Sequence, residues 1–320
     1  MKLSLSWIFE HIDADWKKQD IPLLVEQFNK KTAEIEGVEK LSFDKNSFAI
    51  ALCNSSAGSS CTIEVPEWSF EGVISSRNDA GKPGDCFLVK KDGNSISWAT
   101  LKDFNQDRDI LVSPLCLDSS LVDGGWKELV EWDDVILDVD NKSVTHRPDM
   151  WGHRGFAREV AMLLDLPFKD SSKFLEDIFV KEHPIAGSKD SLFKIKNEAP
   201  DICKRFSAAH FSSVEHKSTP LQMAFRLLFI GAKPINALVD LTNYVMLDWS
   251  QPVHAYDAKT IEEKEIVIRK ANNGEKLLML DETELELTAE DLVVASKTRA
   301  MALAGVMGGM EHSVGKNTTQ

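Results

Sequence analysis

Three side chains that can bind or activate a small polar ligand lie close together in the sequence: Thr242, Asn243 and His254. Pro252 stiffens the backbone two residues before the histidine. A hydroxyl, a carboxamide and an imidazole on one rigid corner can bind a polar substrate and position a water molecule. From spacing alone a structural role is the commoner one, in which Thr242 and Asn243 cap or line a helix and His254 is a hydrogen-bonded core residue.

A helix must position these groups. Leu238, Leu241 and Val245 recur at i, i+3 and i+7, so one side of a helix within residues 233–257 is predicted to lie on a core. The loop Trp249–Pro252 then leads to His254. The sequence therefore predicts a helix–loop corner that carries all three polar groups.

Three stretches resemble the editing domain of the β subunit of bacterial phenylalanyl-tRNA synthetase. They read VDLTNYVMLDWSQPVHAYD at 239–257, LDETELELTAEDLVVAS at 280–296 and MALAGVMGG at 301–309. Together they cover roughly residues 193–320, and their length and order make chance a poor explanation. The positions that match the family's pocket are Thr242, Asn243, Pro252, His254, Ala304 and Gly305.

The resemblance implies a hydrolytic role for this pocket. His254 and Asn243 would orient the attacking water or the ester carbonyl, and Thr242 would contact the 3′ adenosine or the amino group. Pro252 would line one side, and the strand at Ala304-Gly305 would flank the amino acid ring. The family's glutamate that reads the tyrosine hydroxyl lies just beyond Gln320, so the editing domain is expected to be truncated here.

The composition is that of an ordinary globular protein. With 320 residues, 43% of them hydrophobic and 28% charged, the chain can form about two domains and has no disordered majority. No apolar run approaches the ~20 residues of a membrane span, and the start is no signal peptide. Five scattered cysteines indicate reduced thiols in a cytoplasmic protein. A net charge of −14 restricts any RNA contact to a local patch of cations.

We expect an α+β fold of several small modules, with residues 1–40 and 136–190 forming the first. A helix should begin after an Asp20 cap, and Glu34–Lys40 should be a strand. The run THRPDMWGHRGFAREVA at 145–161 resembles the family's first module, with His146 where the family has asparagine. His146 and His153 follow two aspartates, but their spacing requires no metal; a capped, salt-bridged strand-to-helix turn is the favoured interpretation.

Residues 41–135 are predicted to be a β-rich insert, where the family carries an oligonucleotide/oligosaccharide-binding (OB-like) barrel that touches tRNA. Short strands separated by Ser, Asn and Gly indicate a small barrel or sandwich. Trp68, Phe70 and Trp98 are expected in its core rather than in a base-stacking platform. The predicted strands are Ser47–Leu52, Cys61–Val65, Gly72–Ile74, Cys86–Val89, Ser95–Trp98 and Asp109–Val112.

Residues 193–320 are predicted to form a mixed α/β editing domain. Thr219 should cap a helix that Gly231 ends. The glycines that follow Met301 should let a backbone pass close to a ligand or a neighbouring strand. The predicted strands are Cys203–Val214, Ile266–Lys270, Leu292–Ala295 and Met301–Val306, with a hairpin turn at Asp281-Glu282.

The resemblance implies the amino-terminal part of a phenylalanine–tRNA ligase β subunit, a class II aminoacyl-tRNA synthetase, that also hydrolyses mischarged tyrosyl-tRNA(Phe). The implied partners are tRNA(Phe) and the α subunit, which holds the synthetic site; no membrane or DNA partner is expected. No metal or cofactor is expected in this segment, whereas ATP and Mg²⁺ belong to the holoenzyme. A free-standing trans-editing hydrolase and a non-catalytic RNA- or protein-binding scaffold stay open as alternatives.

Overall fold

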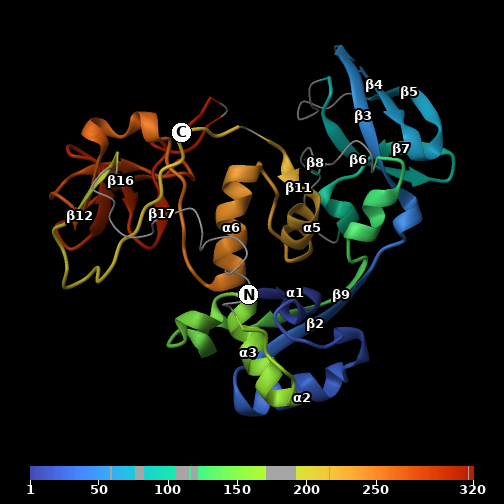
Figure 1. Cartoon of the computed structure of the whole chain (residues 1–320), viewed down its shortest axis with the longest axis horizontal. Helices are drawn as coiled ribbons and strands as arrows, with labels where there is room; N and C mark the ends of the chain where they lie inside the picture. Colours follow the sequence, from blue (N-terminus) through green and yellow to red (C-terminus); the bar gives the residue numbers. More distant parts are fainter. Residues whose placement is uncertain are drawn as a thin grey trace. The chain divides into compact units, whose positions relative to one another are not determined.

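The structure is a computed structural model of the chain, and it describes residues 1–57, 60–75, 83–104, 112, 115–116, 122–170, 192–215, 217–315 and 317–320. The fold is α+β, as expected, and it divides into two compact units (Figure 1). Unit 1 is Met1–Asp170 with Lys217–Gln251, and unit 2 is Ser171–His216 with Pro252–Gln320. Residues 217–251 therefore group with the amino-terminal part of the chain, whereas the expected boundary at residue 193 placed them with the editing domain. The expected limits of the first module and of the insert stay predictions.

The first sheet of unit 1 has the order β1-β9-β2 and is antiparallel. Its strands are β1 (Lys2–Ser4), β9 (Asp133–Val139) and β2 (Ile35–Ser42). The helices of this part are α1 (Leu5–Phe9), α2 (Ile21–Lys31) and α3 (His153–Leu164). Asp20 accepts a hydrogen bond from Leu23 N at 3.0 Å, which confirms the predicted cap of α2. Phe28 of α2 stacks on Phe156 of α3, 5.5 Å between ring centroids, in the core against the sheet.

A five-stranded antiparallel sheet forms the β-rich part of unit 1, with the order β5-β4-β3-β6-β7. The Trp98 indole, on one outer strand, donates a hydrogen bond to Ser75 O on the other at 2.8 Å, so the sheet nearly closes on itself. Trp98 is buried and Trp68 and Phe70 pack against the same core, which confirms that these rings are core residues. Most of the predicted strand Asp109–Val112 lies outside the described residues. The strands are β3 (Phe48–Ala57), β4 (Ser60–Val65), β5 (Phe70–Ser75), β6 (Cys86–Asp92) and β7 (Ser95–Trp98).

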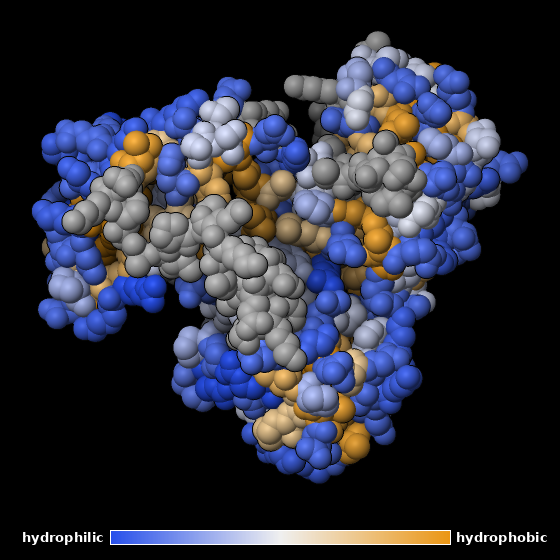
Figure 2. Space-filling view, in the orientation of Figure 1, coloured by the Kyte–Doolittle hydropathy of each residue, from blue (hydrophilic) through white to orange (hydrophobic). Residues whose placement is uncertain are grey.

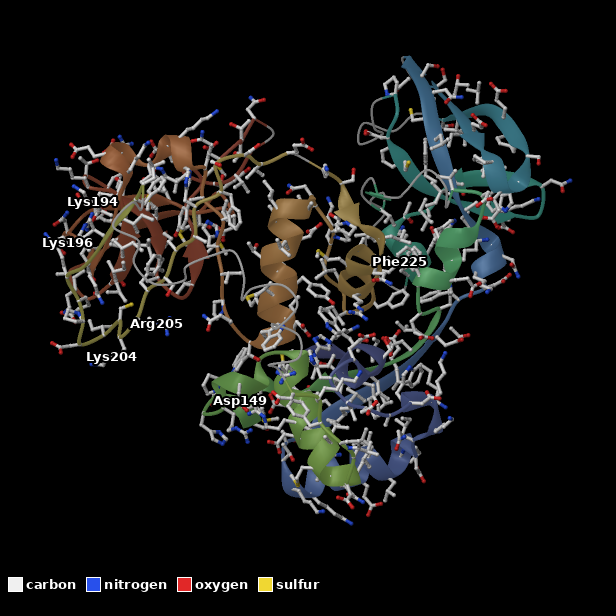
Figure 3. The ribbon with its side chains drawn as sticks, viewed as in Figure 1. Asp149, Lys194, Lys196, Lys204, Arg205 and Phe225 are labelled. Atoms are coloured by element: carbon white, nitrogen blue, oxygen red, sulfur yellow. The ribbon has the colours of Figure 1, made fainter. Side chains whose placement is uncertain are left out.

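Helix α5 (Leu221–Phe229) fills an aromatic core that the β-rich part shares with it. Phe225 points into this core, where it lies edge-on to Phe104 and Trp132 (Figure 3). The predicted Thr219 cap is wrong by one residue, because Pro220 holds the N-cap position. Thr219 instead lies in β11 (Thr219–Pro220), which pairs with β8 (Leu115–Cys116). Its hydroxyl donates a hydrogen bond to the buried carboxylate of Asp240.

Helix α6 (Ala237–Trp249) is the predicted helix, but its buried face is not the predicted one. Its fully buried residues are Asp240 and Asp248, whereas Leu241 is 50% exposed. Asp240 accepts the Thr219 hydroxyl and, through both oxygens, Ile235 N at 2.8 and 3.0 Å. These bonds offset the desolvation of the carboxylate, so the polar residues and not the apolar period fix the rotation of the helix.

Asp248 anchors the carboxyl-terminal turn of α6 inside unit 1. One of its oxygens accepts the Trp7 indole at 2.8 Å and lies 2.6 Å from His11 Nε2. Trp7 is stacked between His153 and Tyr244, with centroids at 3.9 and 4.5 Å. Asp248, near the end of α6, therefore has a structural role in this unit.

His153 is held neutral by its surroundings. Its Nε2 accepts Ser4 N at 3.1 Å and its Nδ1 donates to Leu247 O at 2.7 Å, so the tautomer is fixed. Complete burial lowers the pKa of this imidazole to about 4.

We expect unit 1 to lose stability on acidification because of His153. In the unfolded chain the His153 imidazole takes up a proton near pH 6.5, whereas in the folded chain it stays neutral down to about pH 4. The free energy of unfolding should therefore fall by about 3 kcal/mol as the pH decreases through that window. All eight tryptophans lie in unit 1, so urea denaturation followed by tryptophan fluorescence reports it. His153→Gln should remove this part of the pH dependence; an unchanged profile in the variant would contradict the assignment.

Unit 2 is built on a sheet with the order β10-β12-β15-β16-β17. Its first pair is parallel and the others are antiparallel. A separate hairpin of β13 and β14 turns at Glu282, where φ is 68°, as the sequence predicted. The strands are β10 (Lys194–Asn197), β12 (Glu265–Lys270), β13 (Lys276–Leu278), β14 (Glu284–Glu286), β15 (Leu292–Ala295), β16 (Ala300–Leu303) and β17 (Met307–Gly308).

The predicted strand Cys203–Val214 is wrong. The segment is irregular and mostly exposed, although Val214 N donates to Thr319 O at 2.9 Å. The segment has too few β-branched and aromatic residues, too widely spaced, to form a further strand beside β10, which is the outer strand of the sheet.

None of the helices in the described ranges combines the length and apolar character needed to cross a bilayer. Short 3₁₀ helices lie at Trp16–Lys18, Lys45–Ser47, Pro66–Trp68, Leu101–Phe104, Gly125–Leu129, Asn141–Val144, Pro148–Met150, Ala258–Thr260 and Glu262–Lys264.

Candidate functional site

The predicted site residues fall into two groups, one in each compact unit. Thr242 and Asn243 lie on α6 in unit 1. The chain passes into unit 2 between Gln251 and Pro252. That the two groups share one cavity therefore stays a prediction, and each group is described by itself. The residues in unit 2 are Pro252, His254, Ala304 and Gly305.

The His254 imidazole lies directly over Gly308 of β17. A Cβ atom on Gly308 would overlap the ring, so only glycine permits this approach. On another side the ring meets Tyr256 edge-on, 4.6 Å between centroids. Tyr256 is itself fixed by a β-bridge to Ser313 and by packing on the core. The histidine is thus positioned by contacts of its ring.

Ala304 and Gly305 form the turn of the same hairpin, so the predicted strand Met301–Val306 is wrong at its end, because β16 (Ala300–Leu303) stops before them. Leu303 pairs with Met307 and Ala302 with Gly308, so residues 304–306 close the loop between β16 and β17. Gly305 has φ +75°, a conformation that favours glycine, and apart from its two chain neighbours no atom of the described residues lies within 4 Å of the position of an added Cβ. The structure therefore brings His254 to one hairpin with Ala304 and Gly305, and leaves open space beside the turn.

The state of His254 suits proton transfer. Contact with Gly308 and Tyr256 covers part of the ring, and this desolvation lowers the pKa of the imidazole below its ordinary value. The rest of the side chain remains exposed. Within the described residues no protein group hydrogen-bonds to either ring nitrogen. A neutral imidazole with free nitrogens can accept a proton from water or bind a polar substrate.

On α6 the two polar residues differ. The Thr242 hydroxyl donates to Val239 O within the helix at 2.7 Å, which leaves its oxygen free to accept. Asn243 is half-buried, and its carboxamide has no hydrogen-bond partner in the described part of the chain. Asn236 caps this helix by accepting Leu238 N and Val239 N, both at 3.1 Å. Of the structural alternative, that Thr242 and Asn243 cap or line a helix, capping is therefore wrong, whereas both residues do lie along the helix. Both keep capacity for a ligand.

The turn before α3 is salt-bridged, as the favoured interpretation predicted. Arg147 donates to both oxygens of Asp149 at 2.9 and 2.8 Å and to Glu159 at 2.8 Å. His146 is exposed, and both nitrogens of His153 are engaged in hydrogen bonds. Across the residues that the structure describes, no group of three or more His, Cys, Asp or Glu could hold a metal ion.

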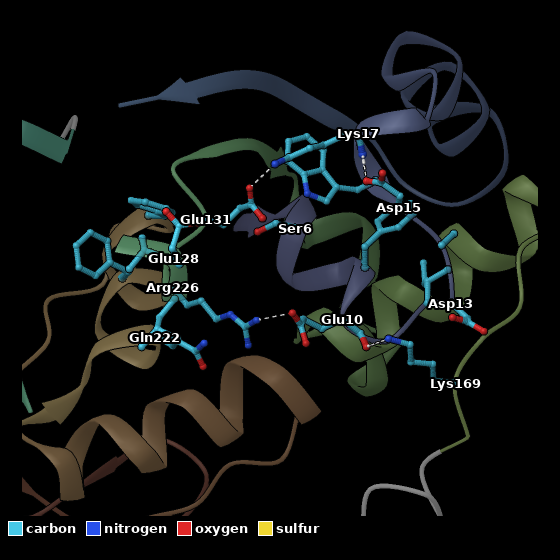
Figure 4. A pocket seen from close by; sticks show the side chains of 18 residues that line it. Ser6, Glu10, Asp13, Asp15, Lys17, Glu128, Glu131, Lys169, Gln222 and Arg226 are labelled. Atoms are coloured by element: carbon cyan, nitrogen blue, oxygen red, sulfur yellow. Dashed lines mark hydrogen bonds and ion pairs between the residues drawn. The ribbon is translucent and has the colours of Figure 1, made fainter. Parts of the chain in front are cut away.

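A hollow of about 770 Å³ in unit 1 contains none of the predicted site residues (Figure 4). It is rich in charges, most of which are already paired. Arg226 binds Glu10 at 2.7 Å and Lys17 binds Glu131 at 2.6 Å across it. Because these groups satisfy each other, we do not assign the hollow a catalytic role.

Sequence reasoning missed two residues beside the site in unit 2. Tyr256 and His312 both stand in or next to the quoted motifs, but nothing in their spacing distinguished them. Tyr256 supports the ring of His254. His312 is 3% exposed, lies beside a second hollow of about 330 Å³, and has its Nδ1 3.0 Å from Thr260 Oγ1. The β-bridge of Tyr256 to Ser313 and the contact of His312 with Thr260 join residues distant in sequence, which periodicity does not encode.

The comparisons with known proteins agree with the motifs. Residues 202–320, which contain every predicted site residue, match the family model of the B3/4 domain. A phenylalanine–tRNA ligase β subunit of Solibacter usitatus is 41% identical over 187 residues, 58% of this chain and 23% of the relative. One of Leptospira interrogans is 35% identical over 212 residues, covering 64% and 24%. One of Bdellovibrio bacteriovorus is 28% identical over all of this chain and 41% of the relative.

Residues 202–320 are therefore similar to the B3/4 domain, and the chain is similar to bacterial phenylalanine–tRNA ligase β subunits, as the motifs predicted. It spans less than half the length of the curated relatives it matches.

Proposed function

We propose that this chain acts as part of a phenylalanine–tRNA ligase β subunit and hydrolyses tyrosyl-tRNA(Phe) formed in error. The observation that carries the proposal is the His254 imidazole inside the matched B3/4 region: its ring lies over Gly308, and no group in the described residues hydrogen-bonds to its nitrogens. In this proposal tRNA(Phe) is the substrate carrier, and an α subunit supplies the synthetic site.

The chemistry follows from the groups available. A neutral His254 takes the proton of a water molecule as that water attacks the ester carbonyl, or holds the water in position. Asn243 can donate to the carbonyl oxygen and Thr242 can accept from the amino group or the ribose. At Gly305 the turn carries no side chain, which leaves room for the aromatic ring of the amino acid.

Such an activity is needed because the site that selects phenylalanine discriminates poorly against tyrosine. A hydrophobic site that selects phenylalanine rejects an added hydroxyl by only about 10²-fold. A site with hydrogen-bonding groups can make the opposite selection, because phenylalanine leaves those groups unpaired.

The test is a comparison of two substrates. The 320-residue chain is incubated with tyrosyl-tRNA(Phe) and with phenylalanyl-tRNA(Phe), and deacylation is followed in single-turnover conditions. The proposal expects faster loss of tyrosine than of phenylalanine. Equal and uncatalysed rates for both would refute editing by this chain and favour a non-catalytic scaffold.

The rate of hydrolysis should depend on pH through His254. Its lowered pKa keeps the imidazole neutral at pH 7, so the catalysed rate should be flat from about pH 7 to 8. Protonation at lower pH removes the lone pair, so the rate should fall with a midpoint below about 6.5. The rates are measured after subtraction of spontaneous ester hydrolysis. A midpoint above 7 would contradict a neutral histidine at the reacting centre.

A further inference from the structure

We infer that one edge of unit 2, formed by Lys194, Lys196, Lys204 and Arg205, binds the phosphodiester backbone of an RNA. We refer to these four residues as the basic edge. The inference rests on the proposed function, because it assigns a part of the surface that would hold the tRNA.

The basic edge departs from the charge of the rest of the chain. Residues 193–206 contain its four cations and two acids, Glu198 and Asp201, whereas the whole chain carries −14. All four cations are exposed, and Figure 3 shows their side chains along one edge of unit 2. The face of this unit drawn in Figure 2 is largely hydrophilic where it is coloured. An acidic protein that binds RNA must do so through such a local patch.

Within the part of the chain that the structure describes, three of the four cations have no carboxylate partner. Elsewhere in unit 2 the cations are largely neutralised: Arg269 by Glu275, Lys276 by Glu284, Lys297 by Glu263 and Arg299 by Glu311. In the described residues no acid pairs with Lys194, Lys204 or Arg205, although Glu265 is opposite Lys194 in the register of β10 and β12. Lys196 is bound to Glu198 at 2.6 Å. Unpaired cations are the ones that gain most from a phosphate.

The local fold holds the basic edge in place. Phe193, Cys203 and Phe206, which flank the cations, pack on the core of the sheet. Asn197 at the end of β10 donates to Cys203 O at 2.7 Å and accepts Ala199 N at 3.0 Å. This side chain ties the strand to the segment that carries Lys204 and Arg205. The four charges are thus presented by anchored backbone.

A second explanation covers only half of the residues. Lysines on an outer strand prevent it from pairing with another sheet, and β10 is an outer strand of its sheet. This accounts for Lys194 and Lys196. Lys204 and Arg205 lie outside the strand, so edge protection does not explain them, whereas one RNA backbone contact explains all four.

The test uses the full chain and a deacylated tRNA(Phe) transcript, so it does not require hydrolysis. Fluorescence anisotropy gives Kd over a range of salt concentrations for the protein with all four basic-edge residues changed to Gln. We expect a ~10- to 100-fold weaker Kd near 0.1 M salt, and a log–log salt slope smaller by about 2 to 3. The matched control changes Lys259, Lys264, Lys276 and Lys297 to Gln, which alters the net charge of unit 2 by the same amount.

Equal losses in the basic-edge variant and the control would overturn the inference, because only net charge would then matter. Loss of binding to anionic lipid vesicles without loss of RNA binding would overturn it as well. If the wild-type chain binds RNA through the basic edge but does not discriminate tyrosyl-tRNA from phenylalanyl-tRNA, the proposed editing function fails and this inference stands. If editing occurs and the basic-edge variant binds RNA normally, only the inference fails.

Discussion

Replacing His254 by alanine should slow the hydrolysis of tyrosyl-tRNA by about 10² to 10⁴-fold, the usual contribution of a positioned acid or base. The ring of His254 is fixed by Gly308 and Tyr256, and no group in the described part of the chain hydrogen-bonds to its nitrogens. The substitution removes the group that would take the proton and leaves the hairpin intact. A variant that clears tyrosyl-tRNA at the full rate would exclude His254 from the reaction.

A second substitution tests the position of the ring separately from its chemistry. Gly308→Val keeps the histidine but places side-chain atoms where the ring lies, so it should reproduce most of the His254→Ala defect. Gly315→Val is the matched control, because apart from its chain neighbours none of the described residues has an atom within 4 Å of an added Cβ there. Tyr256 is one of two tyrosines in the chain, so the NMR signal of labelled tyrosine should shift in the Gly308 variant and not in the control.

Gly155→Ala should destabilise unit 1 by about 3 kcal/mol, the upper range for overpacking in a core. In an exposed helix the same change stabilises by about 1 kcal/mol, so the expected sign is reversed. Gly155 lies in α3, and an added Cβ would overlap the carbonyl oxygen of Asp149. That oxygen also accepts the Ser250 hydroxyl at 2.7 Å, at the end of α6, so it cannot move without loss of the bond.

The measurement is urea unfolding followed by tryptophan fluorescence, which reports unit 1. Gly315→Ala, in unit 2, is the control and should change the free energy of unfolding by no more than about 0.5 kcal/mol. A Gly155 variant as stable as the wild type would show that the close approach to Asp149 is not required.

Local patterns predicted most of the regular elements because each has a local cause. Asp20 caps α2, the alternating runs of residues 47–98 form β3 to β7, and the turn at Glu282 joins β13 to β14. The failures come from long-range effects. Helix α6 is oriented by Asp240 and Asp248, whose partners lie up to 241 residues away, so its apolar period predicted the wrong face.

The candidate site was predictable to a similar extent. Spacing indicated that His254 follows a helix and a stiff loop. The resemblance indicated a strand at Ala304-Gly305, whereas these residues form the turn after β16. No pattern in the sequence shows that the ring of His254 occupies the place of a side chain on Gly308, because that contact joins residues more than fifty positions apart. The prediction for Cys203–Val214 failed for a related reason: in the described residues no neighbouring strand pairs with this segment.

The ladder between β2 and β9 has a consequence for how such chains can change. Ser42 lies opposite Asp133, so the chain leaves this ladder and rejoins it at adjacent positions. A two-residue turn in place of residues 43–132 would preserve the register on both sides. This deletion would expose α5, because its Phe225 and Phe229 would lose the aromatic rings that cover them. Loss of the barrel during evolution would therefore be topologically simple, but it would require new polar residues on that helix.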